Sequence, residues 1–196
     1  MKNRFTVFCF TALVTLIIFF TFNNAVDAKT RIAIIIKTNT VDLSPEIQSD
    51  LSQNMKTLFP QNQYQLVKNQ DLNKEFDNMI TNRVIHDPTD TKIELLELCK
   101  KYNYDAILLL YYHFDTSSSN NNLLRLKSKS MVTLKGRMVY AKTNAYIYNS
   151  NITRVGVSTV TFSNMNQATY ESISKCNEQL FSILELPMAK RTIELS

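Results

Sequence analysis

The sequence contains few of the residues that build phosphate-binding loops and metal clusters. Its 196 residues include 2 glycines, 4 prolines, 2 histidines, 3 cysteines and no tryptophan. This scarcity of glycine argues against Gly-rich phosphate loops and long flexible linkers, and two histidines are too few for a His-rich metal cluster. The formal net charge of +5 is too small for the basic surface of a typical nucleic-acid-binding protein. We therefore expect no metal, no cofactor and no nucleic acid.

The chain opens with the three-part pattern of a secretory signal peptide. Lys2 and Arg4 precede a nearly unbroken apolar run, Phe5–Phe22, and Val26 and Ala28 form the small-x-small exit that signal peptidase reads. We expect cleavage after Ala28 and an extracytoplasmic protein, either periplasmic or secreted. The alternative is an uncleaved anchor, because roughly 18 apolar residues are just enough to span a bilayer. The exit pattern favours cleavage.

The remaining residues, 29–196, have the length of one globular domain. A hydrophobic content of 44% and a charged content of 20% are typical of a chain with a real core. No later segment is long or apolar enough to cross a bilayer, so we expect no integral membrane segment after signal cleavage. Cys9 lies inside the apolar run with no small residues before it, which argues against lipid attachment there.

The first half of this domain alternates apolar strands with capped helices. Continuous apolar runs rich in β-branched residues indicate strands that are covered on both faces. Ser, Asp or Thr residues that precede helical periodicity indicate helix starts. The predicted strands are 31–36, 64–67 and 106–114, and the predicted helices begin at Ser44, Asp71 and Thr91. Crossovers of this length imply parallel pairing.

The second half has a different pattern. Residues Asp115–Asn122 form a polar, low-complexity stretch that is typical of a loop, and strict alternation follows it. Period two with one apolar and one charged side indicates an antiparallel hairpin with one wet face. The returning strands cover 145–162 with a bend at Gly156, and a last helix from about residue 167 ends at Pro187. The predicted fold is α/β (α+β): a mixed sheet of about five strands, a parallel first half plus an antiparallel hairpin, and helices on both faces.

The charged side of that hairpin is the clearest surface signal in the sequence. It contains Arg125, Lys127, Lys129, Lys135 and Arg137, with Tyr146 and Tyr148 returning beside them. Such a basic face could bind an acidic partner, anionic lipid headgroups or an anionic wall polymer. The alternative is a solvated sheet face whose lysines discourage edge-to-edge pairing.

Catalytic signals are weak. His86-Asp87 lies at a loop-to-helix junction, and His113 ends the central strand near Asp115, where α/β folds often place ligands. There is no nucleophile elbow of the Gly-x-Ser-x-Gly type. Cys99 and Cys176 lie on apolar helix faces, where they are either two free buried thiols or a disulfide.

Two segments resemble a bacterial envelope superfamily. The run from Tyr102 through Asp105 to Leu108 is similar to that family's "k..gaDyvi" segment, and the hairpin from Gly136 to Tyr148 is similar to its "r.yd.ktg..iy" segment. The family groups the amino-terminal domain of TolB, the curli-secretion lipoprotein CsgG and the penicillin-binding-protein activator LpoB. The resemblance implies a β/α domain for protein contacts in the envelope, without catalytic residues. This chain has Asn103-Tyr104 where the family tends to have Gly-Ala, and it lacks the lipid-bearing cysteine.

Two classes of function follow from these observations. The first is a non-catalytic exported envelope protein that binds another protein or an anionic surface polymer in an assembly or accessory role. The second is a small extracytoplasmic hydrolase that uses scattered carboxylates and His113. An enzyme needs a deep pocket with convergent polar groups, whereas a binding protein can use an exposed surface.

Overall fold

The structure is a computed structural model that describes residues 29–40, 42–82, 90–122, 125–160 and 165–194. The predicted signal peptide at 1–28 and the His86-Asp87 pair lie outside these residues. The elements, in chain order, are β1 (Thr30–Thr38), α2 (Pro45–Leu58), β2 (Tyr64–Val67), α3 (Gln70–Thr81), α4 (Lys92–Tyr102), β3 (Ala106–Asn122), β4 (Arg125–Tyr140), β5 (Ala145–Val160) and α5 (Met165–Glu194).

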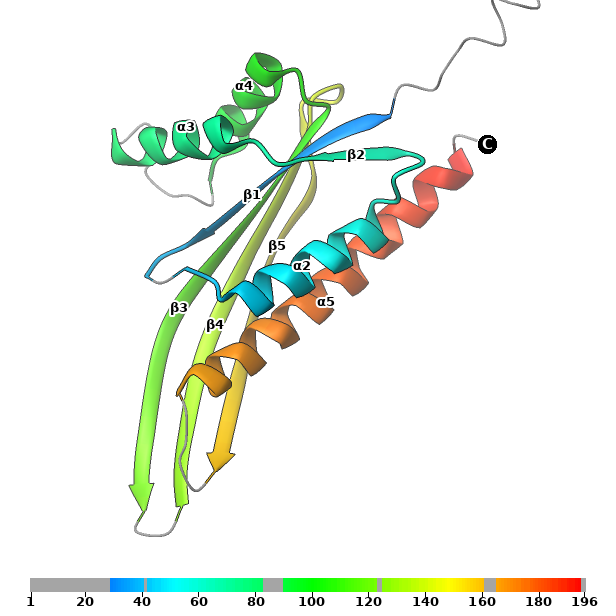
Figure 1. Ribbon diagram of the computed structural model, residues 1–196. Coiled ribbons are helices and arrows are strands. Elements are labelled where there is room, and N and C mark those ends of the chain that lie inside the picture. The colour runs from blue at the N-terminus through cyan, green and yellow to red at the C-terminus, as the bar shows by residue number, and fades with distance from the viewer. Residues whose placement is uncertain (1–28, 41, 83–89, 123–124, 161–164, 195–196) are drawn as a thin grey trace, which may run out of the picture.

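The strands form one mixed sheet in the order β2-β1-β3-β4-β5. β1 pairs in parallel with β2 and β3, whereas β3–β4 and β4–β5 are antiparallel. α2 and α5 cover one face of the sheet, and α3 and α4 lie on the other face at one end (Figure 1). The predicted fold class is therefore confirmed.

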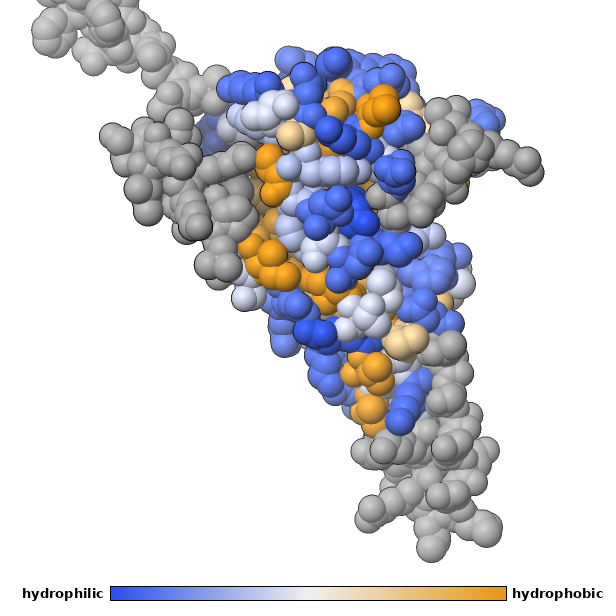
Figure 2. Space-filling model, turned by 180° about the vertical axis from the view of Figure 1, so that it is seen from behind, coloured by the Kyte–Doolittle hydropathy of each residue, from blue (hydrophilic) through white to orange (hydrophobic). Residues whose placement is uncertain are grey.

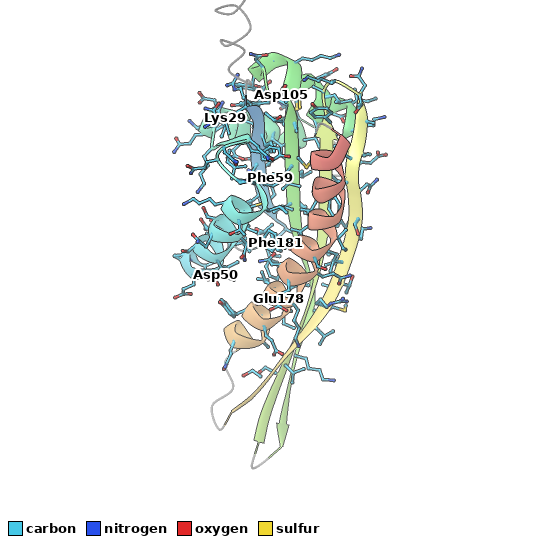
Figure 3. All side chains as sticks on the ribbon, turned by 90° about the vertical axis from the view of Figure 1, so that its right-hand side faces the viewer. Lys29, Asp50, Phe59, Asp105, Glu178 and Phe181 are labelled. Atoms are coloured by element: carbon cyan, nitrogen blue, oxygen red, sulfur yellow. The ribbon has the colours of Figure 1, made fainter. Side chains whose placement is uncertain are left out.

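Strand alternation divides the core into two clusters, one on each face. In β1, Ile32 packs on the α2 and α5 side, while Ala33 and Ile35 pack on the α3 and α4 side. α2 and α5 lie side by side, and Phe59 and Phe181 come from the two segments that meet there (Figure 3). Both faces of β1 from Ile32 to Ile35, and of the first half of β3, are thus buried or half-buried, as continuous apolar runs require.

The helix starts agree with the sequence in part. The Ser44 side chain accepts a hydrogen bond from the Ile47 N–H, with proline in the first turn as predicted. α3, however, is capped by Asn69, whose Oδ1 accepts from the N–H groups of Asp71 and Leu72. Thr91 starts α4 without a side-chain capping bond. An asparagine one residue before the first turn thus performs the role predicted for Asp71.

The predicted carboxyl-terminal ends of two elements, β3 and α5, are wrong. Residues 115–122 belong to β3, and 116–122 pair with β4 from Arg125 to Met131, so the predicted polar loop is strand. The hydrogen bonds of that ladder outweigh the low strand propensity of serine and asparagine. α5 continues through Pro187 to Glu194. Proline removes one backbone donor, but its fixed φ is compatible with a helix.

Asn103 explains one departure from the family pattern. It ends α4 in the left-handed region with φ 54°, which glycine adopts at no steric cost and asparagine tolerates. Two residues later, the Asp105 N–H donates to the Arg31 carbonyl and the Asp105 Oδ2 accepts from the Arg31 N–H. Asparagine in place of glycine therefore still brings β3 into register beside β1.

Within the described part of the chain, none of the helices is long and apolar enough to cross a membrane.

Candidate functional site

The long strands leave one sheet face without a helix over it in the described residues. α5 packs on one face of β4 and β5, but α3 and α4 cover the other face only near the start of β3 (Figure 1). We call the uncovered part the open face. Its described members are Tyr111, His113, Asp115, Lys129, Met131, Thr133, Lys135, Asn151, Thr153, Val155 and Val157.

A row of polar side chains crosses the open face from β3 to β5. A register shift between Phe114 and Thr116 makes Asp115 the extra residue of a β-bulge. Asp115 Oδ2 accepts from the Thr133 hydroxyl at 2.7 Å, and Oδ1 lies 3.2 Å from His113 Nε2. The Thr133 and Thr153 hydroxyls are 3.0 Å apart. The bulge thus directs a carboxylate onto the sheet surface, where it connects three strands.

Charge and apolar area are interspersed on this face. Lys129 is exposed and Lys135 is half-buried, whereas Val155 is 45% exposed. Figure 2 views the molecule from the side away from α2 and α5 and shows groups of hydrophobic residues among hydrophilic ones. Arg125 and Lys127 lie in β4 by their backbone pairing, and their side chains are outside the described set.

Arg137 is not part of an exposed basic surface, which corrects the sequence prediction. Its side chain is 6% exposed. Its guanidinium donates to the carbonyls of Gly136 and Ser150 at 2.9 and 2.8 Å, and to Asn151 Oδ1 at 2.8 Å. These bonds join β4 to β5 where the odd face of β4 enters the α4 side of the core, next to Val139. Arg137 therefore has a structural role, in which it joins β4 to β5.

The two tyrosines lie on opposite faces of the sheet. A register shift between Met138 and Val139 puts Tyr146 opposite Val139 and Tyr148 opposite Met138. Tyr146 packs with the α4-side core, and Tyr148 is buried in the α5-side core against Gly136. Burial raises the pKa of both phenols. The bulge, which strict alternation could not reveal, removes Tyr148 from the predicted basic face.

The cysteines cannot bridge, because the sheet lies between them. Cys99 packs in the α4-side core and Cys176 in the α5-side core, and both are free thiols. Burial raises the pKa of Cys99 to about 12 and that of Cys176 to about 11. Such thiols carry almost no thiolate at neutral pH, so neither is a nucleophile in the folded chain.

His113 lies on the exposed surface of the sheet, beside Asp115. The His113 side chain is 41% exposed on a sheet surface, and a large cavity lies elsewhere, between α2, α3 and the edge of the sheet. None of the residues that line this cavity is histidine or cysteine. Among the described residues, no three His, Cys, Asp or Glu side chains are grouped as metal ligands.

No protein-family model matches the chain, and no curated protein sequence matches it either. Among solved structures, it is similar to a hypothetical protein from Chlamydia trachomatis, with 14% identity, a TM-score of 0.42 and coverage of 80% of this chain and 98% of that one. It is also similar to lipoprotein GNA1162 from Neisseria meningitidis, with 14% identity, a TM-score of 0.39 and coverage of 77% and 97%.

A third similar structure is the LpoB C-terminal domain from Salmonella enterica, with 12% identity, a TM-score of 0.34 and coverage of 64% of this chain and 82% of that one. LpoB is one of the proteins named by the sequence resemblance. At these identities and TM-scores the matches carry no activity or partner with them.

Proposed function

We propose that this chain is a non-catalytic exported protein of the bacterial envelope that binds another protein through the open face. The observation that carries the proposal is the long part of the sheet formed by β3, β4 and β5. It is held by α5 on one side and is uncovered on the other within the described residues. A rigid sheet backed by a helix presents side chains at fixed spacing, which limits the entropy lost on binding.

The chemistry of the open face supports a protein partner over an anionic polymer. With Arg137 in the core, its described cations are Lys129 and Lys135, and Asp115 adds a carboxylate. Hydroxyls at Thr133 and Thr153 alternate with apolar side chains such as Val155. Protein interfaces combine an apolar centre with a polar rim in this way, whereas polymer binding favours a field of one sign.

Photo-crosslinking in living cells tests the proposal. A photoreactive amino acid at position 155 or 153 should form a covalent adduct with one discrete protein of the envelope fraction. The same amino acid at position 93 is the matched control, because Ile93 is also an exposed apolar residue, at 68%, but lies on α4. We expect an adduct from 155 and 153 that is absent from 93.

Binding should also respond to charge placed on the open face. Val155→Asp should weaken capture of that protein about tenfold or more. The variant should leave stability within about 0.5 kcal/mol, because exposed substitutions rarely cost more. Adducts from all three positions, or adducts only with a wall polymer or lipid, would contradict a protein-binding open face.

A further inference from the structure

The outer edge of the sheet is formed by β2 along the first half of β1 and by β1 itself along the second half. Pairing with β2 runs only from Thr30↔Tyr64 to Ala33↔Val67, because β2 has four residues. Pairing of β1 with β3 on its other side continues to Thr38↔Tyr112. Figure 1 shows β1 continuing past the end of β2. Among the described residues, the outer edge of β1 from Ile34 to Thr38 therefore has no strand beside it.

The backbone groups on this edge can be assigned by strand alternation. The Thr30 N–H donates outward to the Gln63 carbonyl, whereas the Arg31 carbonyl accepts inward from the Asp105 N–H. Even-numbered residues of β1 thus direct their N–H and C=O groups outward. Ile36 has both groups on the open edge, and its side chain is 36% exposed. Such an edge is a template for another strand.

A groove accompanies the edge. The cavity there measures about 1230 Å³ and lies between α2 and α3, with β2 at one end. Its α2 side contains the apolar residues Leu43, Leu51 and Met55 together with the polar residues Gln48, Ser52 and Lys56. Its α3 side is polar and includes Asn73 and Asp77. A strand laid along β1 would place alternate side chains against these two unlike walls, because successive residues point to opposite faces.

The rim of the groove is positively charged. Four lysines and two aspartates line it. Lys37 is neutralised by Asp77 at 2.6 Å. In the described part of the chain, Lys29, Lys56 and Lys68 are exposed and form no ion pair. The excess of ammonium groups fits a ligand that carries carboxylates.

We propose that the outer edge of β1 binds an extended, acidic segment of a partner protein by strand addition. Ile36 supplies main-chain hydrogen bonds, the α2 wall takes the apolar side chains, and the lysines attract the carboxylates. A second copy of this chain is a poorer occupant, since a two-fold contact between two such edges would bring like-charged rims together. The site is separate from the open face, so each proposal can fail alone.

A peptide probe tests the inference on the purified exported chain. The probe is an octapeptide of alternating valine and glutamate with blocked ends, and its affinity is measured by calorimetry. Two analogues are N-methylated, one at every valine and one at every glutamate. Only one set of N–H groups in an added strand faces β1, so one analogue should bind at least tenfold more weakly than the other.

Charge variants give a second, independent readout. Lys56→Glu/Lys68→Glu should weaken the probe at least tenfold, and added salt should weaken the wild type. Lys100→Glu/Lys142→Glu is the matched control, because both lysines are exposed outside the groove and should leave affinity unchanged. Hydrogen exchange of the Ile36 amide should slow when the probe binds.

Several results would overturn strand addition. They are equal affinity of the two N-methylated analogues, equal loss in both charge-reversed variants, or unchanged exchange at Ile36. Dimers that form without the probe and are lost in Ile36→Pro would assign the edge to self-association instead.

Discussion

At Gly156 the backbone of the sheet lies very close to the backbone of α5. A Cβ atom added there would overlap the carbonyl oxygen of Ala168 and lie 2.6 Å from the Ser172 nitrogen. Both are backbone groups of a helix, so they cannot rotate away. This glycine is therefore required for close packing, and its φ is not positive.

The first prediction is that Gly156→Ala destabilises the chain. To admit the methyl group, α5 has to shift away from β5, which typically costs about 1–3 kcal/mol. Chemical denaturation should measure this loss. Asn149→Ala, an exposed position on the same strand, is the control and should change stability by less than about 0.5 kcal/mol. An unchanged midpoint for Gly156→Ala would show that the helix can move freely.

The buried thiols make stability fall at alkaline pH. Their folded pKa values, about 12 for Cys99 and about 11 for Cys176, lie above the value of about 8.5 in an unfolded chain. The unfolded state therefore loses protons first, and stability decreases as pH rises through that window. Between about pH 8.5 and 9.5 each thiol should contribute a loss of roughly 1 kcal/mol.

Urea unfolding across that range tests this second prediction. Cys99→Ala/Cys176→Ala should begin less stable, because each removed sulfur leaves a small cavity. Its stability should nevertheless vary less with pH than that of the wild type. Equal slopes would mean that other groups cause the alkaline loss.

The environment of a single residue could be predicted from the sequence only where the pattern of its near neighbours determines it. The Ser44-Pro45 start and the buried faces of Cys99 and Cys176 follow from spacing along one helix. The positions of Tyr148 and Arg137 do not, because they depend on a bulge and on where α4 lies over β4. Neither leaves a local signal in the chain.

At the scale of elements, α5 is the main support of the long strands. It packs along β4 and β5 and against α2, with Leu180 fully buried in that core. Glu178, two residues earlier, points away from the sheet between α2 and α5 (Figure 3).

The third prediction compares alanine substitutions at Leu180 and Glu178. Leu180→Ala should cost about 2–5 kcal/mol, the usual range for a buried leucine. Glu178→Ala should cost less than about 0.5 kcal/mol. Thermal or denaturant unfolding measures both. Similar small losses would indicate that α5 contributes little to holding the sheet.

Element boundaries were predictable where apolar periodicity is strong and not where pairing is long-range. The range of β2 and the start of α4 follow from the sequence, whereas β1 extends one residue before and two residues after the predicted 31–36. The strand character of 115–122 is absent from its own composition and comes from β4 across the ladder. The groove was missed for the same reason, since it exists only because β2 is shorter than β1.

At the scale of the whole molecule, the sheet begins very close to the predicted cleavage site. β1 starts at Thr30, two residues after Ala28. Removal of residues 1–28 would therefore leave every described strand intact.

The fourth prediction is that the exported form begins at Lys29. Amino-terminal sequencing of protein recovered outside the cytoplasm should read Lys-Thr-Arg-Ile. A product that still begins at Met1 and sediments with membranes would contradict cleavage and favour the anchor.

The order of strands in the sheet has a consequence for how the chain folds. β3, β4, β5 and α5 follow one another in the chain and pack on their immediate neighbours, so this half forms through short loop closures. β1 instead meets β3 across 74 residues at the Arg31–Asp105 contact. Closing so long a loop before its contacts form is slow. If the chain is exported with β1 first, β1 can pair early with β2, but its edge toward β3 stays unpaired until residues 106–112 have emerged.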